Sequence, residues 1–136
     1  MYLLDTCVVS EFSKEKPNSG VIQWLAANME SVFLSALTLG EIKKGIVRLG
    51  ATRRAKMLSD WLSDLESQFC GRIKSVNVTV AEQWGEIMAT AAKSGKPRPP
   101  IDALIAATAK VDNLILVTRN VDDMAFMGVK LLNPFK

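Results

Sequence analysis

Short, almost wholly apolar segments recur along the chain and predict buried strands. Strands that are covered on both faces lack the alternation of apolar and polar residues that half-exposed strands show. The first of these segments stops abruptly at an acid, Asp5. The five segments are Tyr2–Leu4, Ser31–Ser35, Ile73–Val78, Leu114–Val117 and a last one near Val129–Leu131.

The intervening segments carry apolar residues at helical spacing. Thr38 with Glu41, and Thr79 with Glu82, match the capping box that opens a helix. The expected helices begin at about Thr6, Val21, Thr38, Thr52, Thr79 and Ile101.

Strands that alternate with helices predict a parallel sheet. We therefore expect an α/β fold, with a mainly parallel central sheet flanked by helices, in one domain over residues 1–136. No repeat or interdomain linker interrupts this pattern.

The composition fits a globular protein, with 49% hydrophobic and 23% charged residues. No apolar run approaches the roughly 20 residues of a membrane helix. The start of the chain lacks the basic region of a signal peptide. Cys7 and Cys70 form neither a metal-site spacing nor a disulfide framework, so a cytoplasmic location is expected.

The absence of histidine excludes several kinds of chemistry. A Ser-His-Asp triad, a histidine acid–base pair and a histidine-ligated zinc site are all impossible. The net charge of +3 is modest, but six basic residues and no acid lie between Lys43 and Lys56. A second basic group, Lys93, Lys96 and Arg98, precedes Asp102. Such groups favour a phosphate backbone, although each also fits a solvated helix face.

Three acids fall where predicted strands give way to helices. Asp5 follows the first strand, Glu41 lies in the helix after the second, and Asp102 opens the helix after Pro100. Each has a structural explanation, as a helix cap or as an acid in a first turn. In an open parallel sheet, however, the carboxyl ends of strands form the site, and there the three could converge.

Converging carboxylates repel one another unless a cation lies between them. Oxygen ligands with room for water suit Mg²⁺ or Mn²⁺ better than zinc or copper. With basic side chains nearby to bind a polyanion, hydrolysis of nucleic acid is the expected chemistry.

At this point the chain resembles the PIN-domain toxins of the VapC and FitB group. The matching segments occur in the family's order and span the chain. They are Leu3–Thr6 with Val8–Glu11, Leu34–Ile42 with Gly45, Ile101–Ala109, Leu116–Asn120 and Leu132–Phe135.

This resemblance implies a single-stranded RNA endonuclease that needs Mg²⁺ or Mn²⁺. It also implies the toxin of a bacterial type II toxin–antitoxin pair, a homodimer checked by a small antitoxin and tied to DNA only through that antitoxin. By the same match, Asp5 and Asp102 are metal ligands, and Glu41 orients the attacking water or completes the metal shell. Thr6 and Thr118 support them through hydroxyl contacts.

Two positions depart from the family pattern. Cys7 stands where asparagine is usual, and Asn120 stands where a fourth acid is common. Asparagine can ligate through its carbonyl oxygen without adding charge. Asp122 or Asp123 could instead supply the fourth group, or both could belong to a solvated loop.

The alternative is a PIN-type module that binds RNA or a protein with little or no cleavage. A phosphatase of the haloacid-dehalogenase type would need a second acid where Cys7 stands. A dinucleotide-binding domain would need a glycine-rich turn after the first strand, and the chain has none there.

Overall fold

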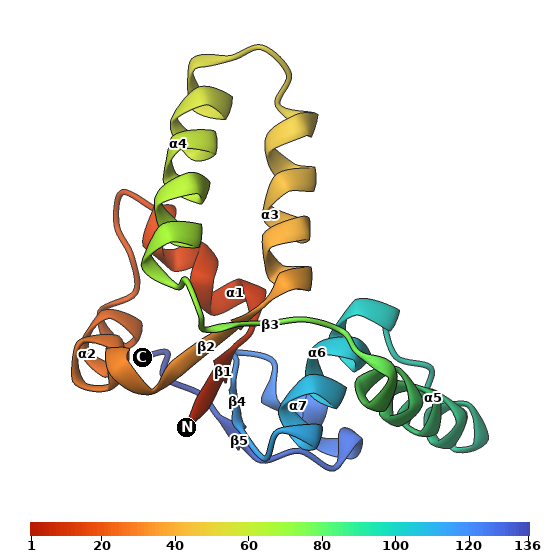
Figure 1. Ribbon diagram of the computed structural model, residues 1–136. Coiled ribbons are helices and arrows are strands. Elements are labelled where there is room, and N and C mark those ends of the chain that lie inside the picture. The colour runs from red at the N-terminus through yellow and green to blue at the C-terminus, as the bar shows by residue number, and fades with distance from the viewer.

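The computed structural model describes all residues 1–136 and contains one five-stranded sheet (Figure 1). Its order is β3-β2-β1-β4-β5, and every neighbouring pair is parallel. The predicted parallel α/β fold is therefore confirmed. The strands are β1 (Tyr2–Leu4), β2 (Val32–Ser35), β3 (Ile73–Lys74), β4 (Ile115–Val117) and β5 (Leu131–Leu132).

Helices cover both faces of this sheet. Successive residues of a strand point to opposite faces, so each strand contributes to two separate cores. Leu4 and Val117 belong to one core with α2, α3 and α4, whereas Leu3 and Leu116 belong to another with α5 and α6. The longer helices are α2 (Ser19–Asn28), α3 (Ala36–Arg48), α4 (Arg53–Gln68), α5 (Val78–Lys93) and α6 (Pro100–Val111). The short ones are α1 (Thr6–Val9), α7 (Val121–Met124) and the 3₁₀ turns η1 (Ser10–Ser13), η2 (Met29–Ser31) and η3 (Ala125–Met127).

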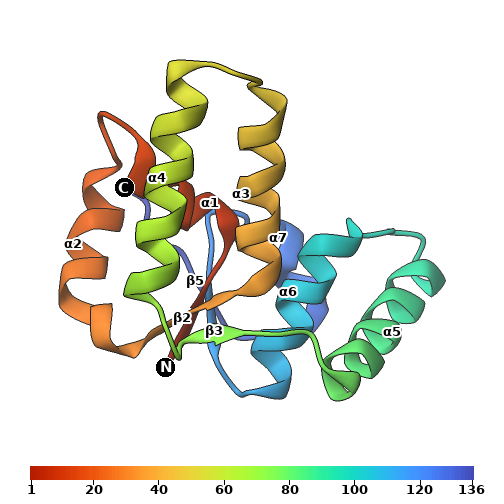
Figure 2. The same cartoon turned by 45° about the horizontal axis from the view of Figure 1, so that its top comes forward.

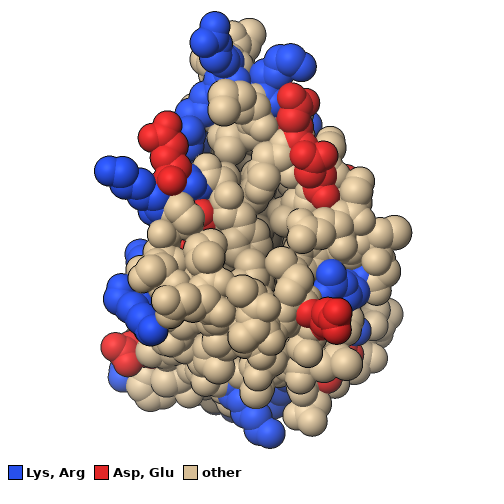
Figure 3. All heavy atoms as spheres, turned by 90° about the vertical axis from the view of Figure 1, so that its left-hand side faces the viewer, with Lys and Arg blue, Asp and Glu red and all other residues tan.

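The α3–α4 hairpin stands out from the sheet, while α5 and α6 pack together on the other side (Figures 1 and 2). Arg48, Arg53, Arg54 and Lys56 lie at the outer end of the hairpin. In Figure 3 basic side chains gather at this end of the molecule. None of the helices has the length and apolar character that crossing a bilayer requires.

Both predicted capping boxes are wrong. Ser35 caps α3 by accepting a hydrogen bond from the backbone N–H of Leu37, and Asn77 caps α5 by accepting one from Val80. Serine and asparagine are among the strongest capping residues, so each helix begins before the predicted threonine.

Two strand predictions also needed adjustment. Only Ile73–Lys74 of the predicted Ile73–Val78 strand pairs with β2; Val76 is exposed beyond the strand, and Val78 is already the first residue of α5. The last strand is Leu131–Leu132 rather than Val129–Leu131.

Candidate active site at the carboxyl ends of β1 and β4

The order of the sheet reverses between β1 and β4, which is where open α/β sheets form their binding crevices. Asp5 follows β1 and Thr118 follows β4. The Asp5 backbone N–H donates to the carbonyl oxygen of Val117 at 2.9 Å, which holds the two strand ends together. The crevice is therefore built from residues near both ends of the chain.

Both carboxylate oxygens of Asp5 are fixed, and the residue is only 4% exposed. Oδ1 accepts a hydrogen bond from the backbone N–H of Thr6 at 2.8 Å, so Asp5 caps α1. Oδ2 accepts a hydrogen bond from the Thr118 hydroxyl, also at 2.8 Å. The capping explanation for Asp5 is thus correct, and the same side chain also lies at the crevice.

Glu41 reaches the crevice from the second turn of α3. Its Oε1 accepts a hydrogen bond from the Thr6 hydroxyl at 2.7 Å. That hydroxyl also lies 3.1 Å from the hydroxyl of Thr38, which is fully buried. Thr6, the residue that follows Asp5, therefore joins the end of β1 to Glu41 on α3.

Asp102 lies in the first turn of α6 and is partly buried. Burial raises the pKa of its carboxyl above the ordinary value, and the charges of Asp5, Glu41 and Asp123 raise that pKa further. Two of the acids singled out in the sequence, Asp5 and Glu41, are therefore close enough to Asp102 to act on its carboxyl. Asp123 joins them from α7.

Asn120 is exposed, and its backbone N–H donates to the Thr118 hydroxyl at 3.0 Å. Asp122 and Asp123 are exposed on α7. Of these two acids, only Asp123 is among the charges that raise the pKa of Asp102. Asp123 is thus the better placed of the two to serve as a fourth acid.

Cys7 also faces Asp5, with its Sγ 3.7 Å from Oδ2 of Asp5 and 3.7 Å from the Thr118 hydroxyl. Burial, opposed by a hydrogen bond from the Arg119 backbone and reinforced by the Asp5 charge, raises the pKa of the thiol. A protonated thiol can donate weakly to Asp5, which is consistent with a supporting contact rather than a ligand.

The acids of the crevice have no cationic side chain as a partner. All three ion pairs in the protein lie elsewhere. No group of three or more acidic or cysteine side chains is arranged to ligate one ion directly. Mg²⁺ commonly takes only one or two carboxylates and keeps several waters, so Asp5 and Asp102 fit that requirement as a pair of hard oxygen donors.

A hollow of about 300 Å³ extends from the crevice along the α3–α4 hairpin. Thr6 and Glu41 lie at its inner end, and Arg54 and Trp61 line it farther out. One member of the first basic group therefore shares a hollow with Glu41, while Lys43 and Lys44 are exposed on α3. Of the second group, Arg98 lies four residues before Asp102.

Sequence patterns missed two contacts of the crevice. The Thr38 hydroxyl contributes through Thr6, and the Cys7 thiol lies against Asp5. Thr38 precedes Glu41 by three residues, a spacing that places both on one face of a helix, but it was interpreted as a cap. Cys7 was noted only as a departure from the family.

Comparison with known proteins gives a consistent result. The PIN domain family model matches residues 2–126. The VapC ribonuclease Y4jK of Sinorhizobium fredii is 30% identical over 138 residues, covering 100% of this chain and 99% of that protein. The FitB toxin of Neisseria gonorrhoeae is 34% identical over 137 residues, covering 99% of both. A solved structure of FitAB bound to a DNA fragment superposes with a TM-score of 0.91 at 33% identity, covering 100% of this chain and 96% of that chain.

Proposed function

Because this chain belongs to the PIN-domain family, in its VapC and FitB group, we propose that it is a metal-dependent endonuclease of single-stranded RNA. We further propose that it acts as the toxin of a bacterial type II toxin–antitoxin module. One observation carries the enzymatic part. The charges of Asp5, Glu41 and Asp123 all raise the pKa of Asp102, and no cationic side chain forms an ion pair with any of the four acids.

In this proposal Asp5 and Asp102 hold the ion. The Thr6 amide and the Thr118 hydroxyl fix the orientation of Asp5, so it need not reorganise when the ion binds. A bound Mg²⁺ or Mn²⁺ would supply a Lewis acid that lowers the pKa of water and offsets charge on the phosphodiester.

Glu41 orients the attacking water and accepts its proton. The Thr6 hydroxyl holds one Glu41 oxygen at 2.7 Å and leaves the other free to accept from water. Asn120 and Asp123 stand at the exposed side of the crevice, where either could contact the ion through water.

Basic side chains on the hairpin hold the RNA backbone. Arg54 lines the same hollow as Glu41, and its guanidinium is suited to bidentate contact with a phosphate. This contact carries no sequence information, so it positions the strand rather than selecting it.

The proposed partner is a small cognate antitoxin. The solved structure of FitAB, a relative at 33% identity over the whole chain, supports this assignment. We expect the chain to form a homodimer and to reach DNA only through the antitoxin.

The activity can be tested by incubating purified protein, freed of any partner, with single-stranded RNA. Cleavage should require Mg²⁺ or Mn²⁺ and stop in excess EDTA. Cleavage that persists in EDTA would contradict the metal mechanism. Metal-independent RNA binding without any cleavage would favour the non-cutting module.

Expression in bacteria tests the biological role. The chain alone should arrest growth, and co-expression of its cognate antitoxin should restore it. Harmless accumulation of the folded, unaltered chain would contradict the toxin assignment.

A further inference from the structure

Two cations and an exposed aromatic ring form a cluster outside the crevice. Phe126, in η3, is 67% exposed. Lys96 Nζ lies 4.6 Å from the centre of its ring, and Arg98 Cζ lies 5.2 Å from it. Two cations from the loop before α6 thus meet an exposed ring that follows α7.

These two cations have no anionic partner within the protein. Neither belongs to an ion pair, and neither side chain donates a hydrogen bond to another protein group. The Arg98 Nε atom is buried and lacks any hydrogen-bond partner. The remaining nitrogens of this guanidinium donate to no protein group, so they are free to bind an anion.

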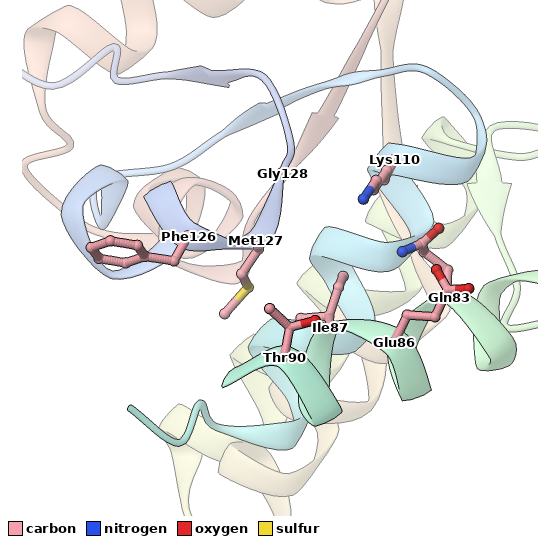
Figure 4. Close-up of a pocket in the computed structure, with 8 residues that line it drawn as sticks. All are labelled: Gln83, Glu86, Ile87, Thr90, Lys110, Phe126, Met127 and Gly128. Carbon is pink, nitrogen blue, oxygen red and sulfur yellow. The ribbon is translucent and has the colours of Figure 1, made fainter. Parts of the chain in front are cut away.

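The cluster adjoins two hollows between α5 and η3. One, of about 140 Å³, is lined by Lys96, Arg98 and Phe126. The other, of about 170 Å³, shares Phe126 and Met127 with the first and reaches Lys110 (Figure 4). Glu86 is the acid that lines the second hollow, while no acid lines the first.

The position of the cluster relates it to the catalytic acids. Arg98 precedes Asp102 by four residues, and Phe126 follows Asp123 by three. Asp123 lies close enough to Asp102 to raise the pKa of its carboxyl. Since a chain extends at most about 3.6 Å per residue, the Cα atoms of Arg98 and Phe126 lie within about 15 Å of those of Asp102 and Asp123, so a strand bound at the acids can reach Phe126.

From these contacts we infer that Lys96, Arg98 and Phe126 form a nucleotide-binding subsite for the RNA strand. The base of a nucleotide near the cleaved phosphate stacks on the exposed surface of Phe126, and Lys96 and Arg98 bind its phosphate. Stacking on an aromatic ring beside basic side chains is how proteins bind unpaired bases with little sequence preference. The inference rests on the proposed function for the identity of the strand.

Binding in EDTA separates this subsite from cleavage. The probes are short single-stranded RNAs of mixed sequence that carry 2-aminopurine at successive positions and a 5′-fluorescein. One 2-aminopurine position should be quenched by the unaltered protein. Phe126→Leu should abolish that quenching and weaken binding about tenfold, whereas Phe126→Trp should keep both.

The roles of Lys96 and Arg98 can be tested by measuring how RNA affinity depends on salt concentration. Lys96→Ala and Arg98→Ala should each weaken binding and reduce the slope of log affinity against log salt by about one. Lys130→Ala is the matched control, because Lys130 is an exposed lysine before β5, at the edge of the sheet opposite the crevice, and does not contact Phe126. Its slope should stay close to that of the unaltered protein.

Other results would overturn the subsite. Unchanged quenching and affinity in Phe126→Leu would exclude stacking. A loss of thermal stability in Phe126→Leu that accounts for its weaker binding would assign the ring a structural role. Altered sedimentation of the variants would assign the cluster to contact with a second copy of the chain.

The outcomes also separate this inference from the proposed function. If the unaltered protein cuts RNA with Mg²⁺ but Phe126→Leu binds normally, only the subsite fails. If RNA binding depends on Phe126 but Mg²⁺ produces no cleavage, the subsite stands and the nuclease assignment fails.

Discussion

Glu11 and the acids of the crevice form two groups of carboxylates with opposite surroundings. Glu11, 3% exposed, forms an ion pair with Lys14 and accepts a hydrogen bond from the backbone N–H of Asn18 at 2.9 Å. The hydrogen bond from Lys14 is the main cause that lowers the pKa of Glu11. Asp5 and its neighbouring acids have only hydroxyl, amide and thiol partners, and the pKa of Asp102 is raised.

This difference distinguishes a carboxylate that stabilises the fold from carboxylates that are suited to bind a cation. The charge of Glu11 is offset within the protein, and it fastens the turn before α2. No cation of the chain pairs with the acids of the crevice, and burial and neighbouring charges disfavour the charged form of Asp102 unless a cation comes from solution. Four experiments on these two groups follow, from the largest expected effect to the smallest.

Asp5→Asn should give the largest effect. The amide oxygen can still cap α1, and the amide NH2 can donate to the Thr118 hydroxyl, so the fold should survive, while the charge that holds the ion is lost. We expect cleavage in Mg²⁺ to fall at least about a hundredfold, since an ion contributes several kcal/mol to stabilising the transition state. In EDTA the thermal melt should match that of the unaltered protein or exceed it.

Asp102→Asn should behave in the same way. If either variant melts far below the unaltered protein in EDTA and loses activity only by unfolding, its acid serves the fold instead.

Glu11→Ala should have the opposite signature. It leaves the Asn18 N–H without its partner, and the half-exposed Lys14 returns to water. We expect the free energy of unfolding in urea to fall by about 1–3 kcal/mol. Cleavage per folded molecule should stay near normal, and Glu11→Gln, which keeps an acceptor, should lose less stability. A specific loss of cleavage with normal stability would place Glu11 among the catalytic groups.

Asn120→Asp adds a charge at the exposed side of the crevice. Affinity for a cation rises with the number of charged ligands, although carboxylate repulsion opposes the gain. We expect a net gain of about 1 kcal/mol, or about fivefold, in the Mg²⁺ dependence of cleavage. Activity at saturating Mg²⁺ need not rise.

Asp123→Asn is the control for this change. It should raise the Mg²⁺ requirement, and Asn120→Asp should restore it. Identical Mg²⁺ titrations in all three proteins would leave Asp5, Glu41 and Asp102 as the whole site.

The pH dependence of stability should show the smallest effect. The pKa of Asp102 in the folded protein is raised above its ordinary value of 3.8, so the protonated form favours folding. In EDTA the free energy of unfolding should therefore rise as pH falls through that raised pKa. The pKa of Glu11 is lowered from 4.5, so its contribution is present above 4.5 and is lost as pH falls through the folded value.

Substitutions show which acid causes each change in the free energy of unfolding with pH. Asp102→Asn should remove the gain and Glu11→Gln should reduce the later loss, both measured by urea unfolding across pH. A gain that persists in Asp102→Asn would mean that another acid carries the repulsion.

The sequence predicted the sheet well because its central strands are buried. Apolar runs such as Leu114–Val117 identify strands without knowledge of their neighbours, and β1, β2 and β4 lie where expected. Helix starts were less predictable, because Ser35 and Asn77 competed with Thr38 and Thr79 as caps. The bounds of the short edge strands β3 and β5 depend on pairing with a neighbouring strand, which the local sequence pattern does not show.

The acids could be found from their positions after strands, but their partners could not. Thr6 and Glu41 are 35 residues apart, and Thr118 and Asp5 are 113 apart. Contacts over such separations arise from the order of strands, not from any local spacing. The environment of Phe126 was missed for the same reason, since its cations come from the loop before α6.

The reversal of strand order between β1 and β4 also sets when the crevice can exist. Asp5 is synthesised 113 residues before Thr118, whose hydroxyl donates to Oδ2 of Asp5, so this contact can form only after α6 and β4 have been made. Asp102 likewise is synthesised only after β1, β2 and β3. A nascent chain that ends before β4 has neither the pairing of β4 with β1 nor the complete set of acids. The crevice therefore cannot assemble until the ribosome has translated β4 and Thr118.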